Sequence, residues 1–400
     1  SMLRTNMDVS SMTGISPLAR KLQEAGIEVS THVKATPLWR GPEKDGITFS
    51  LLCRFLCCRE RFRILVIEGL KPVDYFNHKV EYGNMWHVCE ERFAKYGGDM
   101  NWREGVSFYA KSLCRKYSLQ QEQIDHWYNV CKIQFSSYIS YWANHPDIIN
   151  YAPLIQEQVF DVPYKLDDGR IVRLRGKWDS VDLVGRGKDA GIYLQENKTK
   201  ADINETKMVR QLTFDLQTMI YLIALQRDYD SLTSNLKIPD DPYWNDLLGT
   251  HSSRMPKIHG VRYNVVRRPL SGGKGSIVRH KATKNQLEET KEHYYNRLSV
   301  IIRESPEDYF MRWKIEVSSD DIEKFRKTCL DPILAQLCDW WQCISGGEVS
   351  PHSSRYQNYR HPFGVYNVLD EGGSSDLDEY LATGSEIGLR RVDNLFSELS

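Results

Sequence analysis

Two predicted strands joined by a short glycine-rich reversal constrain the fold of this chain more than any other stretch. The first reads IVRLRGKWDSVDLV from Ile171, the turn reads GRGKDAG, and the second reads IYLQENKTK and contains Lys198. Apolar and polar residues alternate along the first strand, which is typical of a strand with one buried face. This pattern therefore predicts that the two strands are neighbours in one sheet.

These strands bring charged side chains together. Glu196 and Lys198 are two residues apart on the second strand and point to the same face. Asp179, which we expect near the end of the first strand, adds a second carboxylate. Two carboxylates that hold a divalent metal ion, beside a lysine that orients water and offsets charge at a phosphate, are groups that phosphodiester hydrolysis requires.

The rest of the chain predicts an α/β fold with a central mixed sheet flanked by helices. A strand over Ile155–Tyr164 holds Glu157 near its start and leads through a turn at Asp167–Gly169 into the next strand. Ile258–Val266 predicts a further strand. Helices are expected at Pro17–Ala25, Val80–Tyr96, Trp102–Tyr117, Gln120–Asn144, Glu205–Arg227, Asn285–Arg303 and Asp320–Gln342.

Two of these helices and one earlier segment contain residues that matter below. The helix over Val80–Tyr96 has His87 in its middle, and the helix over Glu205–Arg227 places Gln217 and Tyr221 four residues apart on one face. The apolar periodicity of the helix over Glu205–Arg227 is typical of a helix that packs on a sheet with one side. In the earlier segment Ile47–Leu70, we expect Ser50 to cap a helix.

The pattern divides the chain into three parts. We expect an N-terminal extension over residues 1–46, a main domain over 47–345 with a helical insertion around 80–150, and a loosely packed acidic tail over 346–400. The last part is rich in glycine, serine, asparagine and acids, a composition that does not favour a core.

Composition excludes some classes of protein. The 53 basic and 53 acidic residues give a net charge of zero, which argues against a protein that coats nucleic acid but allows a local basic groove. No apolar run approaches the ~20 residues of a membrane span. Nine cysteines at irregular spacing indicate reduced thiols, so we expect a cytoplasmic protein.

The ordered set of motifs resembles the RecB/AddB-type exonuclease branch of the PD-(D/E)XK nuclease superfamily, especially the bacteriophage versions. The resemblance rests on His87 in a helix, Glu157 in a strand, GKWD ending at Asp179, QENK ending at Lys198, and a helix with Gln217 and Tyr221. The stretches TFSLLCRFLCCRERFRILVIEGLKP and YNVVRRP fit the same branch. The resemblance covers about residues 47–345. It implies a restriction-endonuclease-like sheet and, through the bacteriophage versions, a bacterial or phage-infected cell.

The resemblance implies a role for each matching residue. His87, Asp179 and Glu196, with the main-chain carbonyl of Asn197, would be ligands of one or two Mg²⁺ or Mn²⁺ ions. Lys198 would position the attacking water and stabilise the transition state. Three further residues would act around these groups, Glu157 by supporting a metal ion or its waters, and Gln217 and Tyr221 by fixing Lys198 or holding the DNA backbone.

One departure concerns cysteine. Many relatives hold an iron–sulfur cluster with one N-terminal and three C-terminal cysteines. Here Cys57 or Cys58 could supply the first, but the C-terminal counterpart reads YRHPFGVYNVL, with His361 where a cysteine would be expected. We therefore expect a version that lacks the cluster, with Cys329, Cys338 and Cys343 as ordinary buried thiols.

These observations predict a metal-dependent deoxyribonuclease, and by analogy with the family an exonuclease that acts on linear DNA ends, single-stranded or double-stranded. An endonuclease or a nuclease of flaps and branched DNA would use the same catalytic residues. A non-catalytic DNA-binding subunit that keeps the fold and an RNA-processing nuclease are further alternatives, and a protein partner in recombination or replication would fit the resemblance. A subset of nearby basic residues should follow the DNA phosphates, from the group Arg170, Arg173, Arg175, Lys177, Lys200, Lys207, Arg267, Arg268, Lys274 and Lys281.

Overall fold

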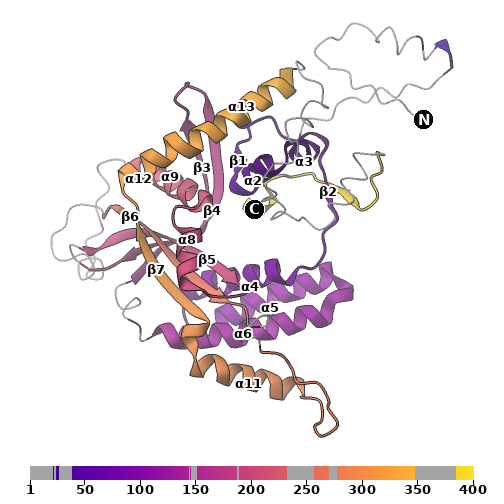
Figure 1. Cartoon of the computed structure of the whole chain (residues 1–400), viewed down its shortest axis with the longest axis vertical. Helices are drawn as coiled ribbons and strands as arrows, with labels where there is room; N and C mark the ends of the chain where they lie inside the picture. Colours follow the sequence, from indigo (N-terminus) through magenta and orange to yellow (C-terminus); the bar gives the residue numbers. More distant parts are fainter. Residues whose placement is uncertain are drawn as a thin grey trace.

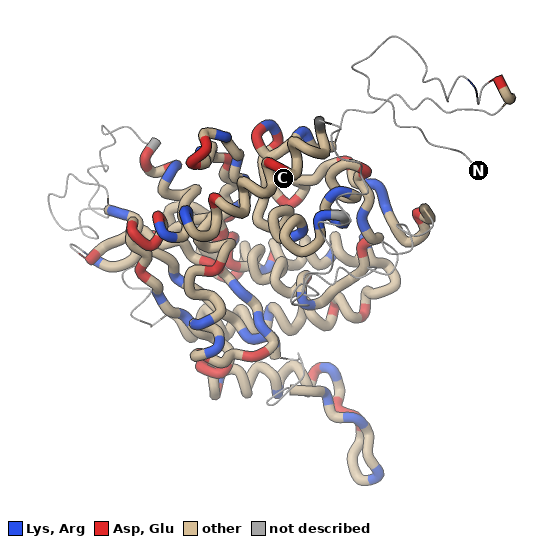
Figure 2. Tube along the Cα trace, turned by 45° about the horizontal axis from the view of Figure 1, so that its top comes forward, with Lys and Arg blue, Asp and Glu red and all other residues tan. Residues whose placement is uncertain are grey.

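A mixed six-stranded sheet forms the centre of the molecule, with helices on both faces (Figure 1). The computed structural model describes residues 21, 24–26, 38–143, 145, 151–186, 189–231, 256–269, 277–346 and 384–400. Basic and acidic residues are interspersed along this part of the chain (Figure 2), in keeping with the zero net charge. Among the described helices, none is long and apolar enough to cross a membrane. The α/β fold with a central mixed sheet is confirmed.

The longest strands form an antiparallel hairpin that supports the rest of the sheet. β3 pairs with β4 along nearly its whole length, through a turn in which Gly169 has φ 92° and the Leu166 backbone N–H donates to the Arg170 carbonyl at 2.8 Å. On its other side, β4 pairs first with the short parallel strand β1 and then with antiparallel β5. β6 lies parallel to β5, and β7 closes the edge antiparallel to β6. The strands are β1 Ile47–Thr48, β3 Tyr151–Lys165, β4 Ile171–Val184, β5 Gly191–Lys200, β6 Ile258–Arg267 and β7 Phe310–Glu316.

The predicted strands are confirmed in type, with longer bounds. Asp179 was expected near the end of its strand, but β4 continues through Val184, so Asp179 lies well inside it. The strand runs on past Asp179 because the segment from Ser180 to Val184 is buried throughout and both β3 and β5 supply it with backbone partners. The edge strand β7 was not predicted, since its FMRWKIE sequence mixes charged and apolar residues.

A layer of four helices covers one face of the sheet. Its aromatic residues form a core of their own, in which Trp86 and Trp102 pack against Phe135 with ring centroids 5.0 and 4.9 Å apart. This layer confirms the helical insertion, and α11, from a later part of the sequence, packs on α6 and completes it. The helix α11 was expected to start at Asn285, but Thr290 caps it with its side chain. The four helices are α4 His78–Tyr96, α5 Met100–Lys116, α6 Gln121–Ala143 and α11 Lys291–Glu304.

The opposite face is covered by helices that surround α9. Residues Met219–Leu225 are all buried, because α9 packs on the sheet with one side and on α2 and α12 with the other. The predicted one-sided helix is thus buried all round. Thr48, not Ser50, caps α2 by accepting from the Leu51 backbone N–H, since the helix begins two residues earlier than expected. The elements of this face are α2 Phe49–Cys57, α3 Arg59–Arg63, a π-helical turn at Ile64–Glu68, α8 Glu205–Leu212, α9 Leu216–Ser231, α12 Ser319–Phe325, a second π-helical turn at Arg326–Leu330, and α13 Asp331–Gly346.

The predicted helix over Glu205–Arg227 is broken in two. Between α8 and α9, Phe214 takes a left-handed conformation with φ 56°, and Asp215 accepts from the Thr218 backbone N–H at 3.3 Å. The Tyr263 hydroxyl of β6 lies 3.1 Å from the Asp215 carboxylate and bonds also to the Leu212 carbonyl. Tertiary bonds from the sheet therefore replace the helical ones that the local sequence favours.

The packed domain extends past both predicted boundaries. Trp39 is fully buried, donates from Nε1 to the Gly46 carbonyl at 2.8 Å and packs edge-on against Trp341. At the other end, β8 (Leu389–Arg391) pairs with β2 (Leu70–Pro72), and Phe396 stacks under the Arg175 guanidinium at 4.0 Å. Residues 384–400 are thus not loosely packed as expected, because they supply both a strand partner and apolar contacts. The predicted helix Pro17–Ala25 lies almost wholly outside the described residues.

We expect Phe396→Ala to lower the free energy of unfolding by about 1–3 kcal/mol, because it removes a half-buried ring and its contact with Arg175. Ile387→Ala is a matched control from the same terminal segment, since Ile387 is 83% exposed, and should change stability by less than about 0.5 kcal/mol. Urea unfolding measures both. Equal effects of the two substitutions would contradict the packing of this segment.

Candidate active site

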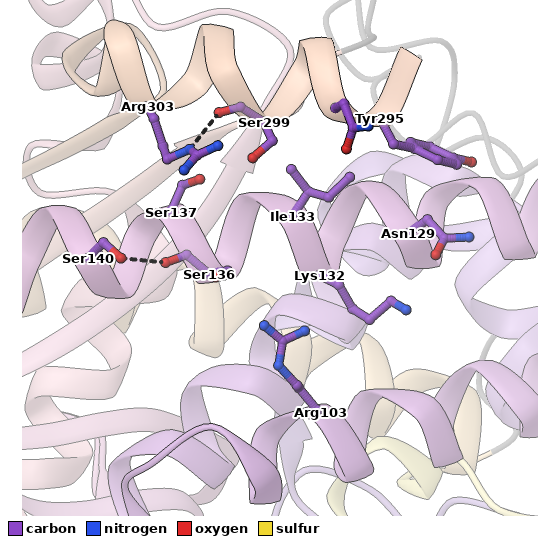
Figure 3. Close-up of a pocket in the computed structure, with 11 residues that line it drawn as sticks. Arg103, Asn129, Lys132, Ile133, Ser136, Ser137, Ser140, Tyr295, Ser299 and Arg303 are labelled. Atoms are coloured by element: carbon purple, nitrogen blue, oxygen red, sulfur yellow. Dashed lines mark hydrogen bonds between the residues drawn. The ribbon is translucent and has the colours of Figure 1, made fainter. Parts of the chain in front are cut away.

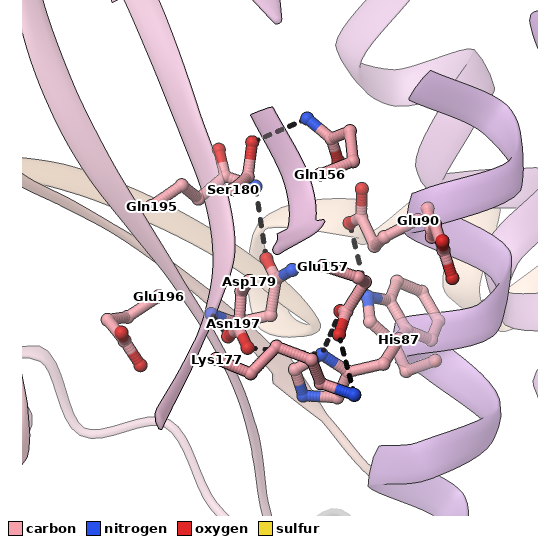
Figure 4. Close-up of polar contacts among 12 residues, drawn as sticks. His87, Glu90, Gln156, Glu157, Lys177, Asp179, Ser180, Gln195, Glu196 and Asn197 are labelled. Atoms are coloured by element: carbon pink, nitrogen blue, oxygen red, sulfur yellow. Dashed lines mark hydrogen bonds and ion pairs between the residues drawn. The ribbon is translucent and has the colours of Figure 1, made fainter. Parts of the chain in front are cut away.

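Three acidic residues lie in one row across three neighbouring strands. Ser180 of β4 is paired with Gln156 of β3 on one side and with Gln195 of β5 on the other. The next position in each strand is an acid, giving the row Glu157, Asp179 and Glu196 (Figure 4). Their convergence is therefore a consequence of strand register rather than of a loop.

The helix α4 adds a histidine to this row. His87 Nδ1 lies 3.0 Å from Glu157 Oε1 and 3.5 Å from Asp179 Oδ1 (Figure 4). Tyr82, Trp86 and Cys89 on the same helix are buried in the helical layer, which turns His87 toward the sheet. One ligand atom from each of His87, Glu157 and Asp179 lies within 4.8 Å of the other two.

The position of Glu157 depends on an unusual backbone conformation. Its φ is 46°, in the left-handed region that costs a non-glycine residue about 1–2 kcal/mol. Regular alternation of buried and exposed residues in β3 begins only at Phe160, so the pattern before it does not fix which way Glu157 points. Lys177, two residues before Asp179 on β4, lies 3.5 Å from Glu157 Oε2 and offsets part of its charge.

Lys198 belongs to a second set of contacts at the end of β5. Its Nζ donates to Gln217 Oε1 at 2.5 Å and lies 3.4 Å from Glu196 Oε2. Gln217 reaches the lysine because the break before α9 starts this helix next to β5. Helix α9 thus fixes the lysine ammonium group against the buried carboxylate.

Burial and like charge raise the pKa of the acids. Burial and the Asp179 charge raise the pKa of Glu196 from its usual 4.5 to about 8, against the opposing effect of Lys198. Burial also raises the pKa of Asp179, although His87 lowers it. Burial lowers the pKa of His87, but Asp179 and Glu157 raise it more strongly, to about 9. The electrostatic field of the carboxylates therefore favours positively charged groups at this site.

The donor set fits a divalent metal ion. Carboxylate oxygens and an imidazole nitrogen are ligands of Mg²⁺ and Mn²⁺, with the histidine favouring manganese. Glu196 is 1% exposed, and its Oε1 has no hydrogen-bond partner among the described residues. An unpaired buried carboxylate oxygen is costly, and a cation beside it would remove that cost. His87, Glu157 and Asp179 could hold such an ion, with Glu196 next in the row.

The structure places the predicted site residues in two groups. Glu157, predicted only to support a metal, joins His87 and Asp179 as a close ligand, whereas the Glu196 side chain is not in that close group and contacts Lys198. The Asn197 backbone N–H donates to Asp179 Oδ2 at 2.9 Å. Tyr221 is 9% exposed and packs edge-on against Phe160. The roles of Tyr221 and of the Asn197 carbonyl stay predictions.

Two residues near the site were missed or left among ordinary charges. Asp215 lies close enough to raise the pKa of both Glu196 and Lys198, and its only sequence signal was a carboxylate before a possible helix start. Lys177 was placed in a general basic group, although it lies two residues before Asp179 and hence on the same face.

Several of the expected DNA-contacting cations have partners within the protein. Arg173 pairs with Asp161, Arg170 bonds to Asp168 and Asp339, and Arg175 donates to the Asp45 carbonyl. Arg173 and Arg175 lie on the less buried face of β4 and Arg170 lies in the turn before it, so these three cations hold β4 to the segments around it. Lys274 lies outside the described residues.

In metal-free solution we expect stability to fall as the pH rises from about 5 to 9. Between pH 4.5 and 8 the folded chain holds a proton on Glu196 that the unfolded chain has lost. His87 acts with the same sign from pH 6.5 to 9. Unfolding releases protons in this range, so a rise in pH favours the unfolded state.

Urea unfolding in a chelator at several pH values measures this slope. Glu196→Gln should flatten it below pH 8, and Glu104→Gln, at an exposed position of α5, is the control. A slope in Glu196→Gln equal to that of the wild type would show that this carboxyl does not titrate as expected.

Comparison with known proteins agrees with this geometry. The family model of the PD-(D/E)XK nuclease superfamily matches residues 47–316, more than half of the chain, whereas a search of curated proteins gives no match. Nucleases of this superfamily generally use divalent metal ions, and the close group of His87, Glu157 and Asp179 provides ligands for one. This chain belongs to the PD-(D/E)XK nuclease superfamily.

Proposed function

We propose that this protein is a metal-dependent deoxyribonuclease that hydrolyses DNA phosphodiester bonds. The observation that carries the proposal is the row of Glu157, Asp179 and Glu196, with His87 and Lys198 beside it. Like charges at this separation oppose one another unless a cation lies among them, so a protein that only bound DNA would gain nothing from keeping them. The site is also half-exposed at His87, where a substrate could reach it.

A metal ion in this site would supply Lewis-acid stabilisation of the negative charge that develops at phosphorus. Its ligands would be His87, Glu157, Asp179 and Glu196, with the Asn197 carbonyl as a further ligand. Mg²⁺ is the default because oxygen ligands dominate, and the imidazole makes Mn²⁺ a good substitute.

Lys198 contributes as a cation. Burial lowers the pKa of Lys198, but Glu196, Asp179 and Asp215 raise it more, so the ammonium group stays protonated at neutral pH. It therefore cannot remove a proton from water. It donates hydrogen bonds instead, orienting the attacking water and stabilising the phosphate oxygens in the transition state. Gln217 holds the ammonium group in place, and Tyr221, one turn further along α9, packs edge-on against Phe160 of the sheet.

The finer assignments are part of the same proposal. We assign the chain to the RecB/AddB-type branch in its bacteriophage version and favour an exonuclease acting on linear ends in the cytoplasm. The order of the motifs supports the branch, and free thiols at all nine cysteines, each within the described residues, fit a reducing compartment. A role in recombination or replication with a protein partner would follow from this branch.

We expect Lys198→Ala to reduce DNA cleavage by about 10²–10³-fold, because it removes a fixed donor to the transition state. Binding to DNA in a chelator should stay close to that of the wild type. Lys165→Ala, at the exposed far end of β3, is the matched control and should cleave normally. Release of nucleotides from labelled DNA with Mg²⁺, Mn²⁺ or a chelator measures the effect. Wild-type protein that binds DNA but does not cut it with either metal would favour a non-catalytic subunit.

Linear and closed circular DNA of the same sequence separate the two modes of cleavage. An exonuclease should degrade the linear form with Mg²⁺ or Mn²⁺ and leave the closed circle intact for at least as long, since it needs a free end. Gel analysis of both forms, with an RNA of the same sequence in parallel, is the measurement. Cutting of the closed circle would show an endonuclease, and preference for the RNA would show an RNA-processing enzyme.

A further inference from the structure

A basic hollow lies on the helical layer, between α6 and α11 with α5 at its side (Figure 3). Its volume is about 430 Å³, which is in the range of sites that hold a nucleotide-sized group. The side chains around it come from three helices and are nearly all polar. They are Arg103, Asn129, Lys132, Ile133, Ser136, Ser137, Ser140, Tyr295, Asn296, Ser299 and Arg303.

The hollow is separate from the active site. Gln134 and Phe135 of α6 contact Tyr82 and Trp86 of α4, the helix that carries His87. Lys132, Ile133 and Ser136 come from other sides of α6 and line the hollow (Figure 3). α6 therefore lies between the two sites, and a ligand in the hollow would not touch the acids.

The charge of the lining is one-sided. It includes three cations and no carboxylate. Elsewhere on the same helix pair, cations have acidic partners, since Lys291 lies 3.3 Å from Glu122 and Arg297 lies 2.8 Å from Glu289. Lys132 and Arg303 have no such acidic partner among the described residues.

The individual contacts locate the strongest positive charge at Arg303 and Lys132. Arg303 Nε donates to the Ser299 carbonyl at 3.3 Å, which directs the guanidinium toward Ser137 (Figure 3). Lys132 Nζ lies over the Tyr128 ring at 4.2 Å, a contact that leaves its charge uncompensated.

The lining residues Arg103 and Asn129 add less positive charge to the hollow, because each has an acidic partner. Arg103 is paired with Asp99 at 3.1 Å, and Asn129 donates to the Asp125 carboxylate at 3.3 Å. An anion is therefore best placed between Lys132 and Arg303, near the serine hydroxyls.

We infer that this hollow binds phosphates of a DNA strand at a distance from the cleaved bond. Lysine, arginine, serine and asparagine are the side chains that contact phosphate and sugar in DNA complexes, and they position DNA without selecting its sequence. The inference rests on the proposed function, because the substrate of a deoxyribonuclease brings a regular series of phosphates to the protein. A second contact on the helical layer would hold the part of the DNA that lies outside the catalytic site.

Binding of labelled DNA in a chelator, where no cutting occurs, tests the inference over a range of salt concentrations. We expect Lys132→Ala/Arg303→Ala to weaken binding on the order of tenfold at low salt and to reduce the slope of log K against log salt by about 1.4 for single strands or 1.8 for duplex. Lys132→Arg/Arg303→Lys keeps both charges and should keep the wild-type slope.

The matched control is Lys111→Ala/Lys284→Ala, which removes two exposed lysines from outside the hollow and should leave the slope closer to that of the wild type. Circular dichroism and urea unfolding confirm that each variant is folded. If Lys132→Ala/Arg303→Ala binds DNA with the affinity and salt slope of the wild type, the inference is overturned. The hollow would then have another ligand, such as an acidic protein or a free nucleotide. Weaker binding of a mononucleotide with no change for the DNA strand would overturn it as well.

Cleavage of the same DNA by the wild type with Mg²⁺ or Mn²⁺ separates this inference from the proposed function. Absence of cleavage by the wild type would contradict the proposed deoxyribonuclease activity. The difference in salt slope between the wild type and Lys132→Ala/Arg303→Ala, measured in the chelator, reports on the hollow alone. Cleavage with an unchanged slope would leave the enzyme and remove only the second site.

Discussion

Repulsion among three buried or half-buried carboxylates is the constraint around which this structure is arranged. Strand register places Glu157, Asp179 and Glu196 in one row, and burial makes their charges harder to screen than on a surface. The protein supplies positive groups from two directions to hold the row together, His87 from the helical layer and Lys198 from the end of β5. The affinity of the site for cations follows from the same arrangement, because the carboxylates cannot separate.

The backbone is unusual on both sides of this row. Among the described residues, Glu157 and Phe214 are the two non-glycine positions with positive φ. The first turns a carboxylate toward His87, and the second separates α8 from α9 so that Gln217, in the first turn of α9, lies beside Lys198. Strained conformations are retained where the surrounding structure requires them, often near functional sites. Here each one positions a side chain that the regular strand or helix would have directed elsewhere.

Much of the architecture could be predicted from local patterns, because long alternating or periodic segments such as β4 and α6 form the same element in most contexts. The sequence also named the side chains that lie close together here, but not how they are grouped. That Glu157 rather than Glu196 would lie closest to His87 depends on the φ of one residue, which alternation does not encode. The break at Phe214 depends on a tyrosine from β6, and the packing of Phe396 depends on Arg175 far earlier in the chain. Such contacts are tertiary and leave no periodic signal.

The pairing of β2 with β8 has a consequence for the making of the protein. Arg391 donates to the Glu68 carbonyl across a separation of 323 residues. At a synthesis rate of about 5–20 residues per second, β2 leaves the ribosome roughly 15–60 s before its partner strand exists. Strands β3 to β7 and helices α4 to α13 are all made within that interval, after β1, α2 and α3. The small sheet therefore cannot close until the central sheet and its covering helices have been synthesised.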